Sequence, residues 1–343
     1  MGINVAYSSS NAYAICTGVS LYSLLENNKM VPDISVYLFS TDISDENRNI
    51  ISSIASSYGR QLTFIDINNQ MDAIAEQFNL KAMRGGYNTF VRLFASNWLT
   101  GIDRILFVDS DTLVVGAIDE LFATPMDGCL IAAVPEVGVY GRFSYGDDPD
   151  IIKTCRKYFN AGVMLINLAL WRQENTSAYI AGKIPTYGKE WSSAEQSIFN
   201  YTINDRCRYV HLKNNFYSMF HFNSYAALRK CFLVDEIIPE EEYREAQDKP
   251  VIIHFIGLPY MRPWYRNNVS PYHALYQKYY GQTPWSAIPL LKIPKNPQFG
   301  FRVFDGILHC LLKYKLYRLY GFVNNFSQGK FKDVFRVLVG HRR

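Results

Sequence analysis

Apolar and polar residues alternate along the first third of the chain in blocks that fit strands followed by helices. Short apolar runs bounded by polar residues predict strands at Ile3–Tyr7, Ile34–Phe39, Leu62–Ile67 and Arg104–Val108. Between them, helical spacing of apolar residues predicts helices at Tyr13–Leu25, Asp45–Tyr58 and Asn88–Leu99. Ser44 is a plausible N-cap for the second helix. Strands that alternate with helices of this length indicate βαβ units, so we expect an α/β fold with a mostly parallel sheet.

The second half of the chain is more mixed. Its patterns predict strands at Cys129–Val134, Val163–Asn167 and Val251–Phe255, and a helix at Ala194–Tyr201. Residues 136–157 show little periodicity, which is typical of a long loop that carries function or acts as a lid. A proline-rich stretch from Pro284 to Pro297 resembles a linker. We therefore expect a globular domain, residues 1–283, followed by an extension, residues 284–343.

Two carboxylates one residue apart follow the strand at Arg104–Val108. The continuous apolar run predicts a strand buried on both faces, and it ends in Asp109-Ser110-Asp111. An unpaired desolvated carboxylate costs several kcal/mol, so this pair needs compensation. A hard divalent cation such as Mn²⁺ or Mg²⁺ provides it, at the strand end where open α/β sheets bind ligands. An isolated Asp-x-Asp pair also fits a turn or a helix N-cap.

Further polar residues stand at the ends of other predicted strands. Asn160 and Gly162 come directly before the run at Val163–Asn167, where an Asn can hydrogen-bond ligand hydroxyls or form an Asn-Gly-type turn. His254 ends the apolar run that begins at Val251. A neutral imidazole suits Mn²⁺ better than Mg²⁺, although a structural hydrogen bond is the simpler explanation for one His.

The helix start near residue 195 carries an acid and an amide. Ser192 and Glu195 have the spacing of a capping box, so a cap explains Glu195 as well as a catalytic role does. Gln196 contributes nothing to such a cap. Further on, Gly257 would allow backbone to approach a phosphate closely, and Arg262 could pair with that phosphate.

The composition is that of a globular protein. Hydrophobic residues make up 48% of the chain and charged residues 19%, which excludes a disordered polypeptide. The 6 cysteines form no Cys-x-x-Cys pair, so we expect reduced thiols in a cytoplasmic protein rather than a zinc or redox motif. No apolar run reaches the roughly 18 residues of a membrane span, and the first residues do not resemble a signal peptide.

Positive charge is concentrated at the end of the chain. The net charge is +4, and residues 300–343 carry nine Lys or Arg and two Asp, which leaves the remainder mildly acidic. Apolar residues from Phe301 to Phe322 approximate helical spacing, and Phe331 to Leu338 repeat the mixture. Such a basic amphipathic helix predicts peripheral attachment to the inner face of the cytoplasmic membrane, and its aliphatic stripe disfavours nucleic acid. Packing on the globule, or an oligomer contact, is the alternative.

Five separated motifs resemble those of glycosyltransferase family 8, which comprises retaining enzymes of GT-A fold that use UDP-sugars and Mn²⁺. In chain order they are Phe90-Val-Arg-Leu93, Leu106 to Asp111, Phe159-Asn-Ala-Gly162, Glu195-Gln196, and His254-Phe-Ile-Gly257 with Arg262-Pro-Trp264. The resemblance covers roughly residues 3–264 in the family's order.

The resemblance implies a role for each matching position. It implies the Mn²⁺ ligands Asp109, Asp111 and His254. It implies the catalytic residues Gln196, Glu195 and Asn160, with Gln196 close to the reacting face of the sugar. A donor-binding surface would consist of Ser8, Ser10, Asn11, Tyr13, Arg92, Ser110, Asn160, Ala161, Gly257 and Arg262. The implied reaction moves galactose or glucose from a UDP-sugar to a glycan or lipid-linked glycan acceptor of the cell envelope.

The chain also departs from the family. Where the family has Asp-Asp-Asn-Tyr after its first strand, residues 9–13 read Ser-Ser-Asn-Ala-Tyr, so the carboxylate expected at the uracil ring is missing. The family has an Asp where this chain has Glu195, and a Lys where it has Arg262. Two more residues separate Arg262 from Gly257 than separate the Lys from the corresponding glycine in the family. A catalytically silent homologue that binds sugar nucleotides or glycans is therefore the alternative function.

Overall fold

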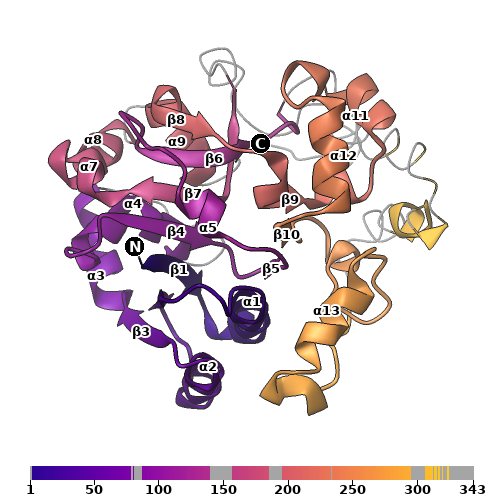
Figure 1. Cartoon of the computed structure of the whole chain (residues 1–343), viewed down its shortest axis with the longest axis horizontal. Coiled ribbons are helices and arrows are strands. Elements are labelled where there is room, and N and C mark those ends of the chain that lie inside the picture. The colour runs from indigo at the N-terminus through magenta and orange to yellow at the C-terminus, as the bar shows by residue number, and fades with distance from the viewer. Residues whose placement is uncertain are drawn as a thin grey trace, which may run out of the picture.

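Two sheets form the framework of the protein. The computed structural model describes residues 2–78, 80, 87–139, 157–184, 195–232, 234–294 and 306–311, with the single positions 313, 314, 316, 319 and 323. A seven-stranded sheet and a three-stranded sheet are present in this part of the chain. Figure 1 shows helices packed around the larger sheet, with the smaller sheet beside it.

The larger sheet has the strand order β3-β2-β1-β4-β7-β6-β8. Its strands are β1 (Ile3–Ser9), β2 (Ile34–Ser40), β3 (Gln61–Asp66), β4 (Arg104–Val108), β6 (Ile131–Pro135), β7 (Phe159–Asn167) and β8 (Cys207–Tyr209). The first four strands in chain order are parallel, β7 runs antiparallel to β4 and β6, and β8 is parallel to β6. The expected α/β fold with a mostly parallel sheet is confirmed.

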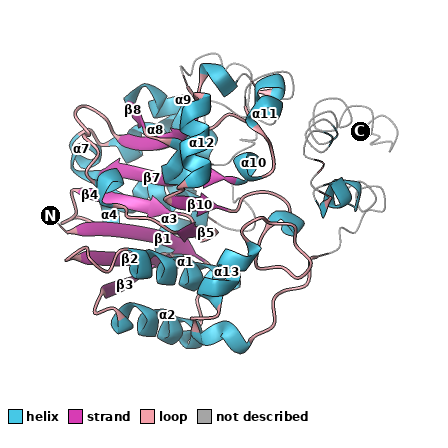
Figure 2. Cartoon of the chain, turned by 45° about the vertical axis from the view of Figure 1, so that its right-hand side comes forward, coloured by secondary structure: helices cyan, strands magenta, loops and turns pink. Residues whose placement is uncertain are grey.

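The central strand β4 is buried on both faces, as its continuous apolar run predicted. Leu106 and Val108 pack in one core cluster with α1 (Ala14–Asn27) and α2 (Asp45–Ser57). Ile105 and Phe107 point the other way, because successive side chains of a strand alternate between faces. The helices of that second cluster are α3 (Asn68–Phe78), α4 (Val91–Trp98), α7 (Leu168–Gln173), α8 (Thr176–Lys183) and α9 (Glu195–Ile203). Figure 2 shows the sheet between these two groups of helices.

The helices predicted in the first third are present, with small shifts at their ends. Ser44 caps α2, since its hydroxyl accepts from the Asn47 backbone N–H at 3.3 Å. The third predicted helix begins as a 3₁₀ turn, η2 (Asn88–Phe90), and continues as α4. α3 was not predicted, because its polar start at Asn68 concealed the helical spacing of Met71 and Ala75.

The smaller sheet has the order β5-β10-β9 and was not predicted as a sheet. It consists of β5 (Thr112–Val114), β10 (Ile252–His254) and β9 (Phe216–Tyr217). β10 runs antiparallel to β5, with His254 opposite Thr112. This pairing brings His254 next to the turn that follows β4. The other helices are α5 (Asp119–Phe122), α10 (Ser218–His221), α11 (Tyr225–Cys231), α12 (Glu240–Asp248) and α13 (His273–Tyr280).

β7 begins earlier than the sequence indicated. It starts at Phe159 rather than Val163, so Asn160 and Gly162 lie inside the strand, and the Asn-Gly turn is wrong. A buried strand tolerates this polar residue because neighbouring side chains satisfy its amide, as described below. Most of the predicted loop, residues 140–156, and the proposed cap Ser192 lie outside the described residues.

The chain stays packed on the globule beyond Pro284. Trp285 is buried in the same core cluster as α1, where a Cβ atom added to Gly18 would lie 2.2 Å from the indole ring. The Tyr280 hydroxyl donates to the carbonyl oxygens of Trp285 and Ile288. The globular part of the chain therefore includes residues at least as far as Ile288.

The start of the basic tail also touches the globule. Leu308 is buried in a small cluster with Phe222, Tyr260 and Met261, and His309 stacks on Tyr260 with ring centroids 5.3 Å apart. Within the described part of the chain, every helix is too short or too polar to cross a membrane.

Candidate active site

The turn between β4 and β5 holds the two predicted carboxylates in place. The Asp109 backbone N–H donates to the Gly162 carbonyl of β7 at 2.8 Å, and the Phe255 N–H donates to the Asp111 carbonyl at 2.8 Å. The Thr112 hydroxyl donates to the Asp109 carbonyl at 2.8 Å. Both sheets therefore fix this turn, and the carboxylates stand at the carboxyl end of β4, as expected.

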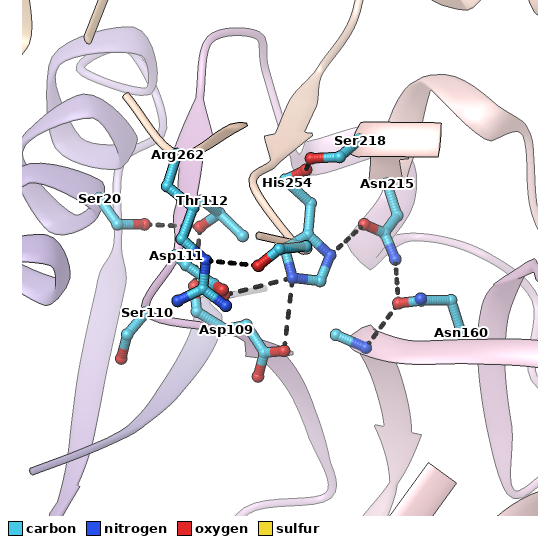
Figure 3. Close-up of polar contacts among 12 residues, drawn as sticks. Ser20, Asp109, Ser110, Asp111, Thr112, Asn160, Asn215, Ser218, His254 and Arg262 are labelled. Carbon is cyan, nitrogen blue, oxygen red and sulfur yellow. Dashed lines mark hydrogen bonds and ion pairs between the residues drawn. The ribbon is translucent and has the colours of Figure 1, made fainter. Parts of the chain in front are cut away.

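Three of the predicted side chains converge at this turn. His254 Nε2 lies 3.3 Å from Asp111 Oδ1 and 3.6 Å from Asp109 Oδ2. One ligand atom from each of the three residues lies within 4.8 Å of the other two. Figure 3 shows the His254 imidazole directed at the carboxylates of both Asp109 and Asp111. The convergence expected from the resemblance is therefore present.

The residues at this point fit a divalent cation. His254 is 1% exposed, and its Nε2 has no hydrogen-bond partner among the described residues. Ligands about 2.0–2.3 Å from one Mn²⁺ lie up to roughly 4.6 Å apart, close to the spread found here. Burial lowers the pKa of His254, but Asp111 and Asp109 outweigh burial and raise it. The two carboxylates therefore favour a positive charge at this point.

Gly162 leaves the space that this convergence needs. A Cβ atom at Gly162 would lie 2.1 Å from His254 Cε1 and 3.0 Å from Asp109 Oδ2. Any side chain there would push the imidazole out of its position. The glycine of the Phe-Asn-Ala-Gly motif is thus required because the His254 imidazole packs directly against it, rather than by a turn.

Asp109, Asp111 and His254 form what is called here the cation cluster. A buried arginine joins this cluster to the start of α9. Arg92 of α4 forms ion pairs with Asp109 and, at 3.7 Å, with Glu195, and it donates to the Ala161 carbonyl. Burial raises the pKa of Glu195 to about 7, with Arg92 opposing the rise and Asp109 adding to it. Glu195 therefore sits beside the cation cluster with a carboxyl that titrates near neutral pH.

The side-chain amides of Asn160 and Gln196 both form hydrogen bonds to other groups of the protein. Asn160 Oδ1 accepts from the Gly162 backbone N–H at 2.9 Å and from Asn215 Nδ2 at 2.8 Å, and its Nδ2 donates to Glu136 at 2.8 Å. Only one N–H of the Asn160 amide remains for a sugar hydroxyl. Gln196 Oε1 accepts from the Ala161 backbone N–H at 2.9 Å, which fixes the amide against β7.

Sequence reasoning did not find Asn215 and Glu136. Asn215 is fully buried, and its Oδ1 lies 3.0 Å from His254 Nδ1. Glu136 is buried as well, and burial raises its pKa although Asn160 lowers it. The one signal in the sequence was a polar residue at the edge of an apolar run in each case. That signal is too common to select these two positions.

The predicted base-binding residues come from two places: Ser8 lies near the end of β1 and Ser10, Asn11 and Tyr13 follow that strand, whereas Ser110 lies in the turn after β4. Ser110 donates to the Ser8 carbonyl at 3.1 Å, and Ser8 donates to the Asn88 carbonyl at 3.2 Å. Asn11 Oδ1 accepts from Ser44 N–H and from Asn47. Asn11 therefore uses its side-chain oxygen to bind the start of α2.

Tyr13 and Arg262 meet across the site. Arg262 donates to the Tyr13 hydroxyl at 2.8 Å and to the Gly257 carbonyl at 3.0 Å. Gly257 has φ +112°, a backbone conformation that side chains disfavour, so the tight bend after His254 explains this glycine. Figure 3 shows the guanidinium beside Asp111. The two extra residues before Arg262 therefore do not carry it away from the site.

A comparison with known protein families identifies the family of this chain. The model of glycosyl transferase family 8 matches residues 4–268. This chain belongs to that family. The match includes every residue that the site brings together, from Ser8 to Arg262.

Several relatives of this family 8 member are named as glycosyltransferases. Lipopolysaccharide 1,3-galactosyltransferase of Salmonella typhimurium is 25% identical over 306 residues, which cover 87% of this chain and 83% of that protein. General stress protein A of Bacillus subtilis is 24% identical over 278 residues, 80% of this chain and 92% of that one.

The fold of this family 8 member is GT-A, as its structural neighbours show. The galactosyltransferase LgtC, solved with donor and acceptor sugar analogues, superposes with a TM-score of 0.66 at 21% identity. The match covers 82% of this chain and 96% of LgtC. The GT-A fold expected from the sequence is therefore confirmed.

Proposed function

We propose that this protein is a retaining, Mn²⁺-dependent hexosyltransferase that moves galactose or glucose from a UDP-sugar to a hydroxyl of a glycan. The observation that carries the proposal is the cluster of Asp109, Asp111 and His254, in which a buried imidazole nitrogen with no hydrogen-bond partner in the described part of the chain faces two carboxylates. Mg²⁺ is a possible substitute, but the imidazole ligand favours Mn²⁺. The names of the lipopolysaccharide galactosyltransferase and glucosyltransferase relatives support hexose transfer.

Asp109, Asp111 and His254 would hold the cation, which supplies Lewis-acid charge against the negative charge of the departing diphosphate. Arg262 faces the same region from the loop after β10 and is suited to pair with phosphate oxygens. Burial lowers the pKa of Arg262, but Asp111 and Tyr13 outweigh burial and raise it, so the guanidinium stays charged. Tyr13, joined to Arg262, would flank the base.

Retention follows most simply from attack on the face that the diphosphate leaves. The bond from the anomeric carbon to the phosphate oxygen breaks while the acceptor oxygen bonds to the same face, and the acceptor proton passes to the departing phosphate. Gln196 is a poor nucleophile, because an amide oxygen is neutral, and its Oε1 is held by the Ala161 N–H. Gln196 would therefore stabilise the positive charge that develops on the anomeric carbon, rather than form a bond to that carbon.

The acceptor is proposed to be a glycan or lipid-linked glycan of the cell envelope. The tail supports attachment to an anionic membrane: Ile307, Tyr314, Leu316 and Leu319 are exposed, and Lys and Arg are interleaved with them. Leu308 points the other way and packs on Tyr260 and Met261, so one side of the helix at residues 306–311 faces the globule. In this proposal the tail packs on the globule with one side and attaches to the membrane with the other. The enzyme then acts at the inner face of the cytoplasmic membrane.

A donor screen tests the proposal. Purified protein is incubated with UDP-galactose, UDP-glucose and other sugar nucleotides, with Mn²⁺, with Mg²⁺ and with EDTA, and release of the nucleoside diphosphate is measured. We expect Mn²⁺-dependent hydrolysis of a UDP-hexose. A catalytically silent homologue, for which the missing carboxylate at residues 9–12 is the supporting observation, would bind a nucleotide without hydrolysing any donor.

A further inference from the structure

The strongest unassigned feature is a chain of buried amides behind the cation cluster. It runs from the Gly162 backbone through Asn160 and Asn215 to His254, and each of these links is a hydrogen bond of 2.8–3.0 Å. All three side chains are at least nine-tenths buried. Figure 3 shows the chain as a row on the side of the imidazole away from the carboxylates.

The direction of every hydrogen bond in this chain follows from its first member. A backbone N–H can only donate, so the Asn160 atom that faces the Gly162 N–H must be the carbonyl oxygen. The same oxygen faces Asn215, so Asn215 must present its NH₂ group there. The other end of the Asn215 amide is then the oxygen, and it can only accept.

We infer that Asn215 is a positioning residue that holds His254 as the Nδ1–H tautomer and so presents the Nε2 lone pair to the divalent cation. Since Asn215 Oδ1 accepts, the hydrogen must reside on His254 Nδ1. In the neutral ring the other nitrogen, Nε2, then carries the lone pair, and it faces Asp109 and Asp111. The inference deepens the proposed function and rests on its cation site.

Local structure explains why Asn215 is suited to this role. It ends the 3₁₀ turn η5 (Leu212–Asn215) and directly precedes β9, which pairs in parallel with β10. The register places Tyr217 beside His254, so the residue two positions earlier reaches the imidazole from a rigid strand start. Hydrogen bonds of this kind to the second nitrogen of a metal-binding His orient the ring, and their loss typically weakens metal binding 10–100-fold.

Binding of Mn²⁺ alone tests the inference without any assay of transfer. Asn215→Leu removes both hydrogen bonds at similar volume, and we expect Mn²⁺ affinity measured by calorimetry to fall about 10–100-fold. The nitrogen coupling of the bound Mn²⁺, seen by pulsed electron paramagnetic resonance, should weaken towards that of His254→Gln. Asn215→Asp keeps an acceptor for the Nδ1 hydrogen, so it should recover most of the affinity.

A matched control separates orientation from stability. Asn28 is buried too; its amide accepts from the Ile118 N–H and donates to the Leu24 and Gly116 carbonyls, none of which belongs to the cation cluster. Asn28→Leu should lower the melting temperature by a similar amount and leave Mn²⁺ binding unchanged. If Asn215→Leu does not fold, Asn215→Ser replaces it and is compared with Asn215→Asp at matched melting temperature.

The outcomes separate this inference from the proposed function. Wild-type protein that binds no Mn²⁺ would overturn both. Wild-type binding, together with an Asn215→Leu variant that binds within threefold and keeps its nitrogen coupling, would overturn the role of Asn215 alone. A ¹⁵N spectrum of the Mg²⁺-loaded protein in which the hydrogen of His254 resides on Nε2 would do the same.

Discussion

The two halves of the site differ in how their side chains are held. The cation half (Asp109, Asp111, His254, Gly162 and Asn215) is fixed by buried hydrogen bonds from two sheets. The base half (Ser8, Ser10, Asn11, Tyr13 and Arg262) lies on the end of β1, the turn after it and the loop after β10, and its Tyr13–Arg262 hydrogen bond is exposed to solvent. Groups that must act on developing charge profit from rigid placement, whereas groups that admit a nucleotide must move.

The contrast predicts that changes in the cation half remove catalysis. Asp111→Asn keeps the volume and removes a charge that both the proposed cation and Arg262 face. We expect kcat/KM for donor hydrolysis to fall on the order of 10³-fold, because charge stabilisation in the transition state is lost. Steady-state kinetics across a range of Mn²⁺ concentrations measures this. Full activity at high Mn²⁺ would instead assign Asp111 to affinity alone.

Gln196 belongs to the rigid half in its manner of attachment, because the Ala161 N–H holds its amide. Gln196→Ala should lower kcat about 10²-fold and change the KM for the donor much less, since the amide acts mainly on charge present in the transition state. Steady-state kinetics with a saturating acceptor separates the two constants. An unchanged kcat with a raised KM would make Gln196 a ground-state binding residue.

The cation half was largely predictable from the sequence, and the reason is physical. A continuous apolar run predicts a buried strand, and charged residues at its end must then find partners. The same pattern placed His254 at the end of β10, and the resemblance to family 8 then implied that it is a ligand. The resemblance to family 8 supplied Arg92 and Gln196, which local patterns alone did not distinguish from a helix surface and a cap.

Contacts that depend on pairing between distant strands were not predictable. Asn215 reaches His254 only because the two-residue strand β9 pairs with β10, and two apolar residues are too short for a pattern. For Asn160 the local pattern left a turn and a ligand contact both open, because its partners, Glu136 and Asn215, come from elsewhere in the chain. Trp285 was placed in a linker, because prolines surround it and its contact with Gly18 is long-range.

Glu195 tests how strongly burial changes the ionisation of a carboxyl next to the cation half. Its pKa of about 7 in the folded protein exceeds the ordinary Glu value near 4.5, so the folded state binds the proton more tightly. Stability from this group is therefore present below about pH 4.5 and is lost as pH rises towards 7, by up to about 1.4 kcal/mol per pH unit. Glu195→Gln should remove this slope.

The measurement for Glu195 is a set of urea unfolding curves of metal-free protein from pH 4.5 to 7.5. The difference between the wild type and Glu195→Gln isolates the one carboxyl, because the other titrating groups are common to both. Parallel stability curves for the two proteins would show that Glu195 is ionised throughout and that Arg92 outweighs burial.

The base half should respond more weakly, and through binding. Arg262→Lys keeps a positive charge but loses the fork that reaches Tyr13 and Gly257 together. We expect about a tenfold rise in KM for the donor, with kcat changed less than threefold. Tyr13→Phe is the matched control, since it removes only the hydroxyl that Arg262 contacts. A fall in kcat as large as that of Gln196→Ala would place Arg262 in the rigid half.

The tail should matter least for chemistry on a soluble acceptor. The boundary expected at residue 284 would remove Trp285 from the core, so the informative truncation comes after Pro294. That protein should keep kcat within about twofold but no longer sediment with anionic vesicles, because each Lys or Arg near such a surface contributes about 1 kcal/mol. Salt should release the intact protein in the same assay.

Leu308→Asp distinguishes packing of the tail from its attachment to membrane. It places a charge in the cluster with Tyr260 and Met261, next to the loop that carries Arg262, while it keeps every basic residue of the tail. We expect a lower melting temperature and a small rise in donor KM, with vesicle sedimentation largely retained. If the truncated protein sediments as well as the intact one, or if truncation after Pro294 unfolds the globule, the membrane role falls and the tail is a structural helix.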